Sequence, residues 1–172
     1  MDFEKVIKER YSVRKFQDKP LEKSDIDKII NASHIAPTGC NIQPQRILVI
    51  NSEESVNKLK SCTKCHFDAP CAFLICYNSD ETWTRPYDGA KSAPVDASIV
   101  TCHMMLEAHN IGVGSCWVMH FDPKKMREEF NIPDNFTPHA LLVAGYPHKD
   151  SVPMEMHEKV RDINEVVYYD SF

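Results

Sequence analysis

The stretch from Pro94 to Asn110 places the strongest constraint on how this chain can fold. It has the length and composition of a long helix, and its only formally charged residues are Asp96 and Glu107. Its large apolar side chains are spread around the whole helix circumference: Val95, Ile99, Val100, Met104, Met105 and Leu106. A helix this apolar is buried on most sides. Because a chain of 172 residues offers a core of limited size, we expect this helix to be shared with a second subunit.

Capping signals predict shorter helices elsewhere in the chain. Ser24, with Asp27 completing a capping-box-like pair, predicts the start of a second helix. Asp122 followed by Pro123 is typical of an N-cap and a first helical residue, and predicts a helix to Phe130. The remaining expected helices run from Asp2 to about Arg10 and from Ser52 or Glu53 to about Cys62.

Short apolar runs predict strands at residues 47–50, 72–77, 115–119 and 140–144. The run Ile47–Ile50 is continuously apolar, which predicts a strand buried on both faces. Residues 166–169 are also β-prone and lie at the C-terminus. The sequence shows no internal repeat and no low-complexity linker. The pattern therefore predicts one α+β domain over residues 1–172, with helices around a mixed sheet.

The charge balance and the cysteine count narrow the class of protein. A net charge of −5 and a pI near 5.9 argue against nucleic acid or an anionic membrane as the main partner. The N-terminus lacks the apolar core of a signal peptide, and no apolar run is long enough to span a bilayer. We therefore expect a cytoplasmic location. The seven cysteines, an odd number, are then expected to be reduced thiols.

A basic run near the N-terminus, Arg10–Phe16, is a candidate phosphate site. Arg10 and Arg14 carry planar donor groups suited to phosphate, and Ser12 between them adds a neutral donor. The alternative interpretation is a solvated basic turn. Late in the chain, Lys159 and Arg161 offer two more cations, which by themselves would be taken for surface charges.

Two further segments carry recognisable patterns. Asn41 and Gln43 lie in the run Pro37–Pro44, and their amides can both donate and accept hydrogen bonds. The alternative is that they satisfy the local backbone of a loop. The second segment, Gly112–Val118, contains two glycines, but it follows a helix and lacks a third glycine. It is therefore not a dinucleotide fingerprint, and the glycines are better interpreted as a helix stop.

These four segments, in this order and spacing, resemble the nitroreductase family of FMN-dependent oxidoreductases. The resemblance extends from Arg10 to Tyr169. It implies a nitroreductase-like fold, with a mixed, mostly antiparallel sheet flanked by helices. It also implies an intertwined homodimer with an exchanged C-terminal tail and with two flavins at the subunit interface.

The resemblance also implies roles for individual residues. The residues expected to hold the ribityl chain and phosphate of FMN are Arg10, Tyr11, Ser12 and Arg14, together with Lys159 and Arg161. The neighbouring subunit is expected to contribute Pro37, Thr38, Gly39, Asn41 and Gln43, whose amides suit the pyrimidine edge of the flavin. Cys40 is expected to face the substrate. The sequence departs from the family at Gln45, where the usual residue is tryptophan.

The last group surrounds the expected third strand. The family places a backbone N–H against flavin N5, and the match through Phe121 and Asp122 puts it near Met119. Its neighbours Trp117, Val118 and His120 are expected to line the flavin, with no catalytic side chain required; a role for His120 as an acid is the alternative. The resemblance places Cys62 and Cys65 near the pyrimidine edge. Together with His66 and Cys71 they could also suggest a metal, but the second pair of a zinc site is absent, so we expect none.

The implied activity is transfer of hydride from NAD(P)H through flavin N5 to an electron-poor acceptor, such as a nitroaromatic or a quinone, in a ping-pong reaction. Because the chain is short for the family, we expect an open site with broad acceptors, and the polar loop at residues 78–94 is where a lid could form. Two alternatives remain. One is another reduction within the family, such as dehalogenation or flavin fragmentation. The other is a flavin- or zinc-binding protein without turnover.

Overall fold

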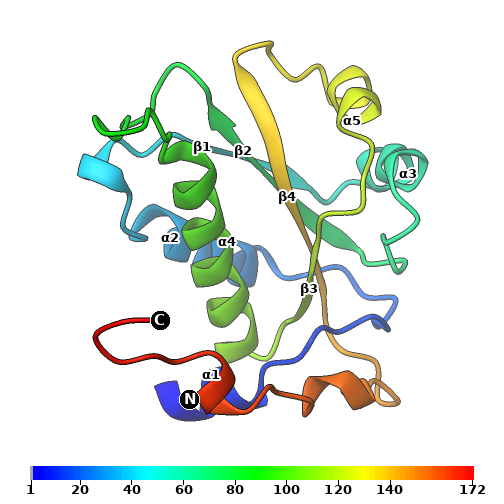
Figure 1. Cartoon of the computed structure of the whole chain (residues 1–172). Helices are drawn as coiled ribbons and strands as arrows, with labels where there is room; N and C mark the ends of the chain where they lie inside the picture. The colour runs from blue at the N-terminus through cyan, green and yellow to red at the C-terminus, as the bar shows by residue number, and fades with distance from the viewer. Residues whose placement is uncertain (1) are drawn as a thin grey trace.

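A computed structural model describes residues 2–172 and has a four-stranded antiparallel sheet at its centre (Figure 1). The strand order is β1-β2-β4-β3. Their bounds are Gln45–Ile50 for β1, Cys71–Asn78 for β2, Gly114–Val118 for β3 and Phe136–Gly145 for β4. The only parallel pairing among the described residues is an isolated bridge between Ser12 and Ser115. This bridge lies outside the named strands, so the four-stranded sheet itself is antiparallel.

The two central strands, β2 and β4, divide the core into two layers because their side chains alternate between the faces of the sheet. Phe73 and Ile75 pack in the cluster that holds Val100 and Met104 of α4 (Ala93–Asn110). Leu74, on the opposite face, packs with residues of α3 (Glu53–Cys62) and α5 (Pro123–Phe130). Figure 1 shows α4 along one face, with α2 (Lys23–His34) beside it and α1 (Phe3–Glu9) near its C-terminal end.

Several predicted boundaries are confirmed by local hydrogen bonds. Ser52 caps α3, and its hydroxyl accepts from the backbone of Ser55, whose own side chain reaches back in a capping box. The Asp122 carboxylate accepts from the backbone of Lys124 and Lys125 at the start of α5, with Pro123 in the first turn. Asp2 stands at the N-cap position of α1, but its side chain makes no capping bond.

The predicted start of the second helix was wrong. The N-cap of α2 is Glu22, so Ser24 lies inside the helix. Asp27 pairs with Lys23 one turn earlier instead of completing a capping box, with 2.5 Å between Nζ and Oδ2. The helix ends at His34.

The prediction that Ile47–Ile50 is buried on both faces was also wrong. β1 is an edge strand that pairs only with β2, and most of its residues are partly exposed. A continuous apolar run shows that a segment is extended and apolar, but it does not fix the position of the strand in the sheet.

The β-prone tail forms no strand within the single chain. We define the C-terminal tail as residues 152–172. It contains two short 3₁₀ turns, η2 (Glu155–His157) and η3 (Ile163–Glu165), and its remaining residues are irregular and exposed. Within residues 2–172, no residue after Pro147 takes part in a β-bridge. No helix of the described residues is long and apolar enough to cross a membrane.

Helix α4 is less buried within one chain than its composition predicts. Val100 and Met104 are fully buried, whereas Val95 is 59% exposed and Met105 and Leu106 are only partly covered. Part of the apolar circumference therefore lies at the surface of the single chain, which is the side available to a second subunit.

A partly buried histidine beside α4 makes stability depend on pH. Ser98 on α4 hydrogen bonds to Nε2 of His139 at 2.8 Å, and burial lowers the pKa of His139. In the unfolded chain the histidine binds a proton at its ordinary pKa of about 6.5. The free energy of unfolding therefore decreases as the pH falls from that value through the lower pKa of His139 in the native protein. We expect His139→Gln to flatten this loss in the free energy of unfolding, measured by urea titration. An unaltered slope in His139→Gln would contradict the assignment.

Candidate cofactor site

The basic run lies along the free edge of β3, where it is fixed by its own backbone. Val13 is buried, and its N–H donates to the carbonyl of Ser115 at 2.9 Å. Gly114 allows this close approach, because a Cβ there would come 2.8 Å from Cγ2 of Val13. Alternation along an extended segment then turns Ser12 and Arg14 away from Val13. The local fold thus presents the donors of the run together at one surface.

Two arginines of this run have no acidic partner. Among residues 2–172, neither Arg10 nor Arg14 forms an ion pair, whereas the adjacent Lys15 pairs with Asp150 at 3.4 Å. Arg14 instead contacts weak acceptors: Nη1 lies 3.2 Å from the carbonyl of Ser12 and 3.0 Å from Sδ of Met154. Its guanidinium also stands 5.9 Å from the ring centre of Phe67. The pair therefore presents uncompensated positive charge, which suits an anionic group.

The C-terminal segment is held next to the basic run through Tyr11. The Tyr11 hydroxyl donates to the carbonyl of Ser151 at 3.1 Å, and its ring stands edge-on to His157 at 6.4 Å. Lys159 and Arg161 follow directly and are exposed. At present they pair with Glu155 and Glu165 of their own segment. The tail thus brings the predicted late cations to the same end of the molecule (Figure 1).

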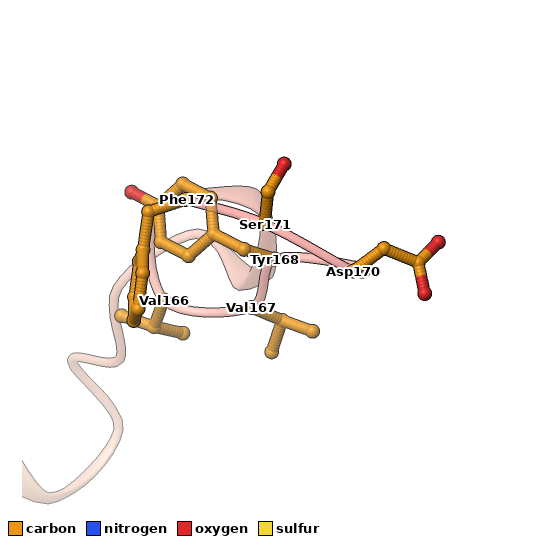
Figure 2. A pocket seen from close by; sticks show the side chains of 6 residues that line it. All are labelled: Val166, Val167, Tyr168, Asp170, Ser171 and Phe172. Atoms are coloured by element: carbon orange, nitrogen blue, oxygen red, sulfur yellow. The ribbon is translucent and has the colours of Figure 1, made fainter.

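The last residues of the tail curl into a hook around a shallow hollow of about 450 Å³ (Figure 2). The rings of Tyr168 and Phe172 lie next to each other with their planes tilted by 52° and their centres 5.3 Å apart. The hollow is lined by Val166, Val167, Tyr168, Asp170, Ser171 and Phe172. All six side chains are exposed.

The end of β3 presents backbone groups at its free edge. Because Ser115 bonds outward to Val13, the alternate residues Trp117 and, just beyond the strand, Met119 direct their backbone groups to the same side. An open groove of about 730 Å³ begins there, lined by Lys60, Ser61, Cys62, Thr63, Lys64, Met119, His120, Phe121 and Asp122. The Thr63 hydroxyl donates to the carbonyl of His120 at 2.5 Å, which fixes one wall of the groove to the other.

The thiols near this groove differ in burial. Cys62 is buried in the core and Cys65 is half-buried, whereas Cys40, at the far end of the molecule, is exposed. Burial raises the pKa of Cys116, against the opposing effect of Arg14, and raises the pKa of Cys71 to about 12. Thiols this hard to ionise are poor nucleophiles. Within residues 2–172, no three His, Cys, Asp or Glu side chains are grouped as a metal site would need.

The amide segment forms a tight loop at the other end of α4. It contains the 3₁₀ turn η1 (Gly39–Asn41), and three of its residues have left-handed backbone angles: Cys40 with φ 50°, Asn41 with φ 56° and Gln43 with φ 56°. The loop is tied to α4 by one hydrogen bond, from the N–H of Gly39 to the Asp96 carboxylate at 2.8 Å. Cys40 and Asn41 are exposed at its tip.

The predicted site residues therefore form two groups that a single chain keeps apart. The basic run, the late cations and the start of β3 lie around the C-terminal half of α4, whereas the amide loop lies at its N-terminus (Figure 1). An 18-residue helix is about 27 Å long. From the sequence, Asp96 was noted only as one of two formal charges in an apolar helix, and neither Asp96 nor Phe67 was assigned a role in the site. An acid in such an apolar helix was the signal that could have drawn attention to Asp96.

Comparison with known proteins identifies the family. The nitroreductase family profile matches residues 7–69 and 63–146, which together cover most of the chain. A nitroreductase family protein from Clostridium difficile 630 has the same fold over the full length of both chains, with a TM-score of 0.93 and 44% identity. The chain therefore belongs to the nitroreductase family, and the expected α+β nitroreductase-like fold is confirmed.

Two further proteins are similar to this chain over most of its length. A structure described as an FMN-dependent nitroreductase, from Clostridium difficile R20291, has a TM-score of 0.80 and 25% identity over 97% of this chain and 98% of that one. A protein of Methanothermobacter thermautotrophicus, provisionally named NADH dehydrogenase/NAD(P)H nitroreductase, is 28% identical over 159 residues. That match covers 86% of this chain and 78% of the relative.

Proposed function

We propose that this protein is an FMN-dependent NAD(P)H oxidoreductase that reduces small electron-poor acceptors. The observation that carries this proposal is the pair Arg10 and Arg14 on either side of Ser12, two cations that have no acidic partner within residues 2–172. Such a donor set fits the phosphate of FMN. Family membership and the names of the FMN-dependent and NAD(P)H-linked relatives support the same assignment.

The two separated groups of site residues support a shared site in a homodimer. A second copy that covers the open side of α4 would bring its amide loop to the basic run of the first. An apolar groove of about 360 Å³ between α1, α2 and α4 includes Phe3, Ile35 and Leu106 and is available for such a contact. The exposed apolar tail from Val160 to Phe172 would exchange between the subunits.

In this proposal the residues of the chain bind and orient FMN, and none of their side chains has to transfer a proton. Bound FMN supplies a two-electron carrier that accepts hydride from NAD(P)H and delivers it to the acceptor. Arg10, Ser12 and Arg14 hold the phosphate end, and the backbone N–H near Met119 stabilises developing negative charge at the ring. No side-chain acid is needed, since solvent can supply protons. His120 therefore has no assigned role.

The loop after β2 supports an open site. Residues 83–92 form a compact hairpin, closed by the pair Arg85 and Asp88 and by a bridge between Thr84 and Lys91. A turn of this size covers little surface, which favours broad acceptors such as nitroaromatics and quinones. Dehalogenation by the same flavin chemistry is the second candidate within the family.

Initial-rate kinetics test the proposed reaction. With NADH or NADPH varied at several fixed concentrations of a nitroaromatic or quinone, we expect parallel double-reciprocal lines, because the donor leaves before the acceptor binds. Intersecting lines would contradict the ping-pong order. A flavin-loaded protein that oxidises neither nicotinamide cofactor would contradict the enzymatic function.

A further inference from the structure

Asp96 is a buried carboxylate that joins the amide loop to the start of α4, because one oxygen bonds to Gly39 of the loop and the other to Ser92 at the N-cap of the helix. It is 3% exposed and lies in the first turn of α4. Oδ1 accepts the N–H of Gly39 at 2.8 Å, and Oδ2 accepts the hydroxyl of Ser92 at 2.8 Å. Burying a charged group is unfavourable unless it is hydrogen bonded, and the N-terminus of a helix favours negative charge. The carboxylate is thus stable where it stands, and it fixes one loop amide.

The loop that Asp96 fixes has a conformation that needs support. Cys40, Asn41 and Gln43 all have positive φ, which is unfavourable for residues other than glycine and persists only where the surroundings enforce it. Thr38 provides part of that support: its hydroxyl accepts the N–H of Gln43 at 3.0 Å and its carbonyl accepts the N–H of Asn41 at 3.0 Å. These bonds lie within the loop. They shape it, but they do not hold it against the rest of the protein.

The contact with α4 depends on glycine at position 39. A Cβ added to Gly39 would come 2.9 Å from Oγ and 3.1 Å from Cβ of Ser92. Both distances are shorter than ordinary van der Waals contacts, so the backbone of the loop packs directly against Ser92 at the start of α4. The bond to Asp96 is the polar part of this contact with α4; from the other side, Nη1 of Arg46 donates to the carbonyl of Gln43 at 3.2 Å.

We propose that Asp96 is a positioning residue for the flavin: it holds the amide loop in the conformation in which Asn41 and Gln43 meet FMN bound by a second copy. This inference rests on the proposed function. Without the carboxylate, the N–H of Gly39 loses its acceptor and the left-handed residues are free to relax. The amides then leave their binding positions, although the core of the protein is unchanged.

The test measures the FMN dissociation constant of the flavin-free protein by fluorescence quenching, at a temperature well below the melting point of every variant. We expect Asp96→Ala to weaken binding about tenfold or more, because it removes a charge-assisted bond that orders the loop. Asp96→Asn keeps an acceptor for Gly39 and a donor for Ser92, so it should stay within about threefold of the parent. Ser98→Ala, on the same helix, is the matched control and should bind as the parent does.

A second variant reaches the same contact from the loop side. Gly39→Ala leaves α4 intact and pushes the loop away from Asp96, so it should also weaken FMN binding, even if Asp96→Ala does not fold. In the flavin-free protein, both Asp96→Ala and Gly39→Ala should speed amide hydrogen exchange in residues 38–43 without changing exchange in β2 and β4.

The outcomes separate this inference from the proposed function. A parent protein that binds no FMN would refute the proposed function itself. A parent that binds FMN, with folded Asp96→Ala or Gly39→Ala variants of equal affinity, would refute the role of Asp96 alone. Equal weakening in Asp96→Asn and Asp96→Ala would also refute it, because the acceptor would then not be what matters.

Discussion

Replacing Arg14 with alanine is expected to weaken FMN binding by about 10- to 100-fold, the effect of losing one charge-assisted hydrogen bond to a phosphate. Arg14 is exposed and contacts only the Ser12 carbonyl, the Met154 sulfur and the ring of Phe67. Its removal should therefore leave the free energy of unfolding nearly unchanged. The dissociation constant for FMN and a urea titration, measured on the same preparation, separate the two effects.

The neighbouring lysine provides the matched control. Lys15→Ala removes the same charge one residue away, but Lys15 is paired with Asp150 and points elsewhere. It should retain FMN with nearly the affinity of the parent. If Arg14→Ala keeps the parent flavin occupancy, or if Lys15→Ala loses as much, the phosphate role of Arg14 is wrong and only general charge attraction remains.

Mixed dimers should recover flavin that neither parent variant can hold. Arg14→Ala is one lesion, and the double variant Asn41→Ala with Gln43→Ala is the other; the structure places these groups at opposite ends of α4. If each site combines the basic run of one chain with the amide loop of the other, a mixed dimer has one doubly damaged site and one intact site. We expect one tightly bound FMN per mixed dimer.

The mixed dimer can be prepared by co-expression with two different affinity tags and purified over both. Flavin content per dimer is then read from absorbance and compared with each homodimer. A mixed dimer as poor in flavin as its parents would mean that each site lies within one chain. That result would refute the shared site, whereas failure to form any dimer would refute the homodimer itself.

The sequence predicted the elements better than their surroundings. The starts of α3 and α5 could be predicted from Ser52 and Asp122, because capping is a local interaction. Ser24 misled because the helix begins two residues earlier, at a boundary with no side-chain cap. Whether β1 lies at the edge of the sheet depends on strand order, which no local pattern in Ile47–Ile50 contains.

In the candidate site, too, local features could be predicted from the sequence, whereas contacts between distant segments could not. Donor chemistry could be predicted from residue types, as for Arg10 and Arg14. The support of the amide loop could not, since the bond between Gly39 and Asp96 joins residues far apart in the chain. The tail was expected to be extended, but in a single chain its residues have no strand beside them. These features depend on contacts between segments that are far apart in the chain.

The most direct test of the account is the visible spectrum of the purified protein, followed by anaerobic addition of NADH and then NADPH. We expect a yellow protein, or one that becomes yellow with added FMN, whose absorbance band near roughly 450 nm bleaches with at least one of the two donors. A protein that stays colourless and takes up no FMN would contradict the central claim.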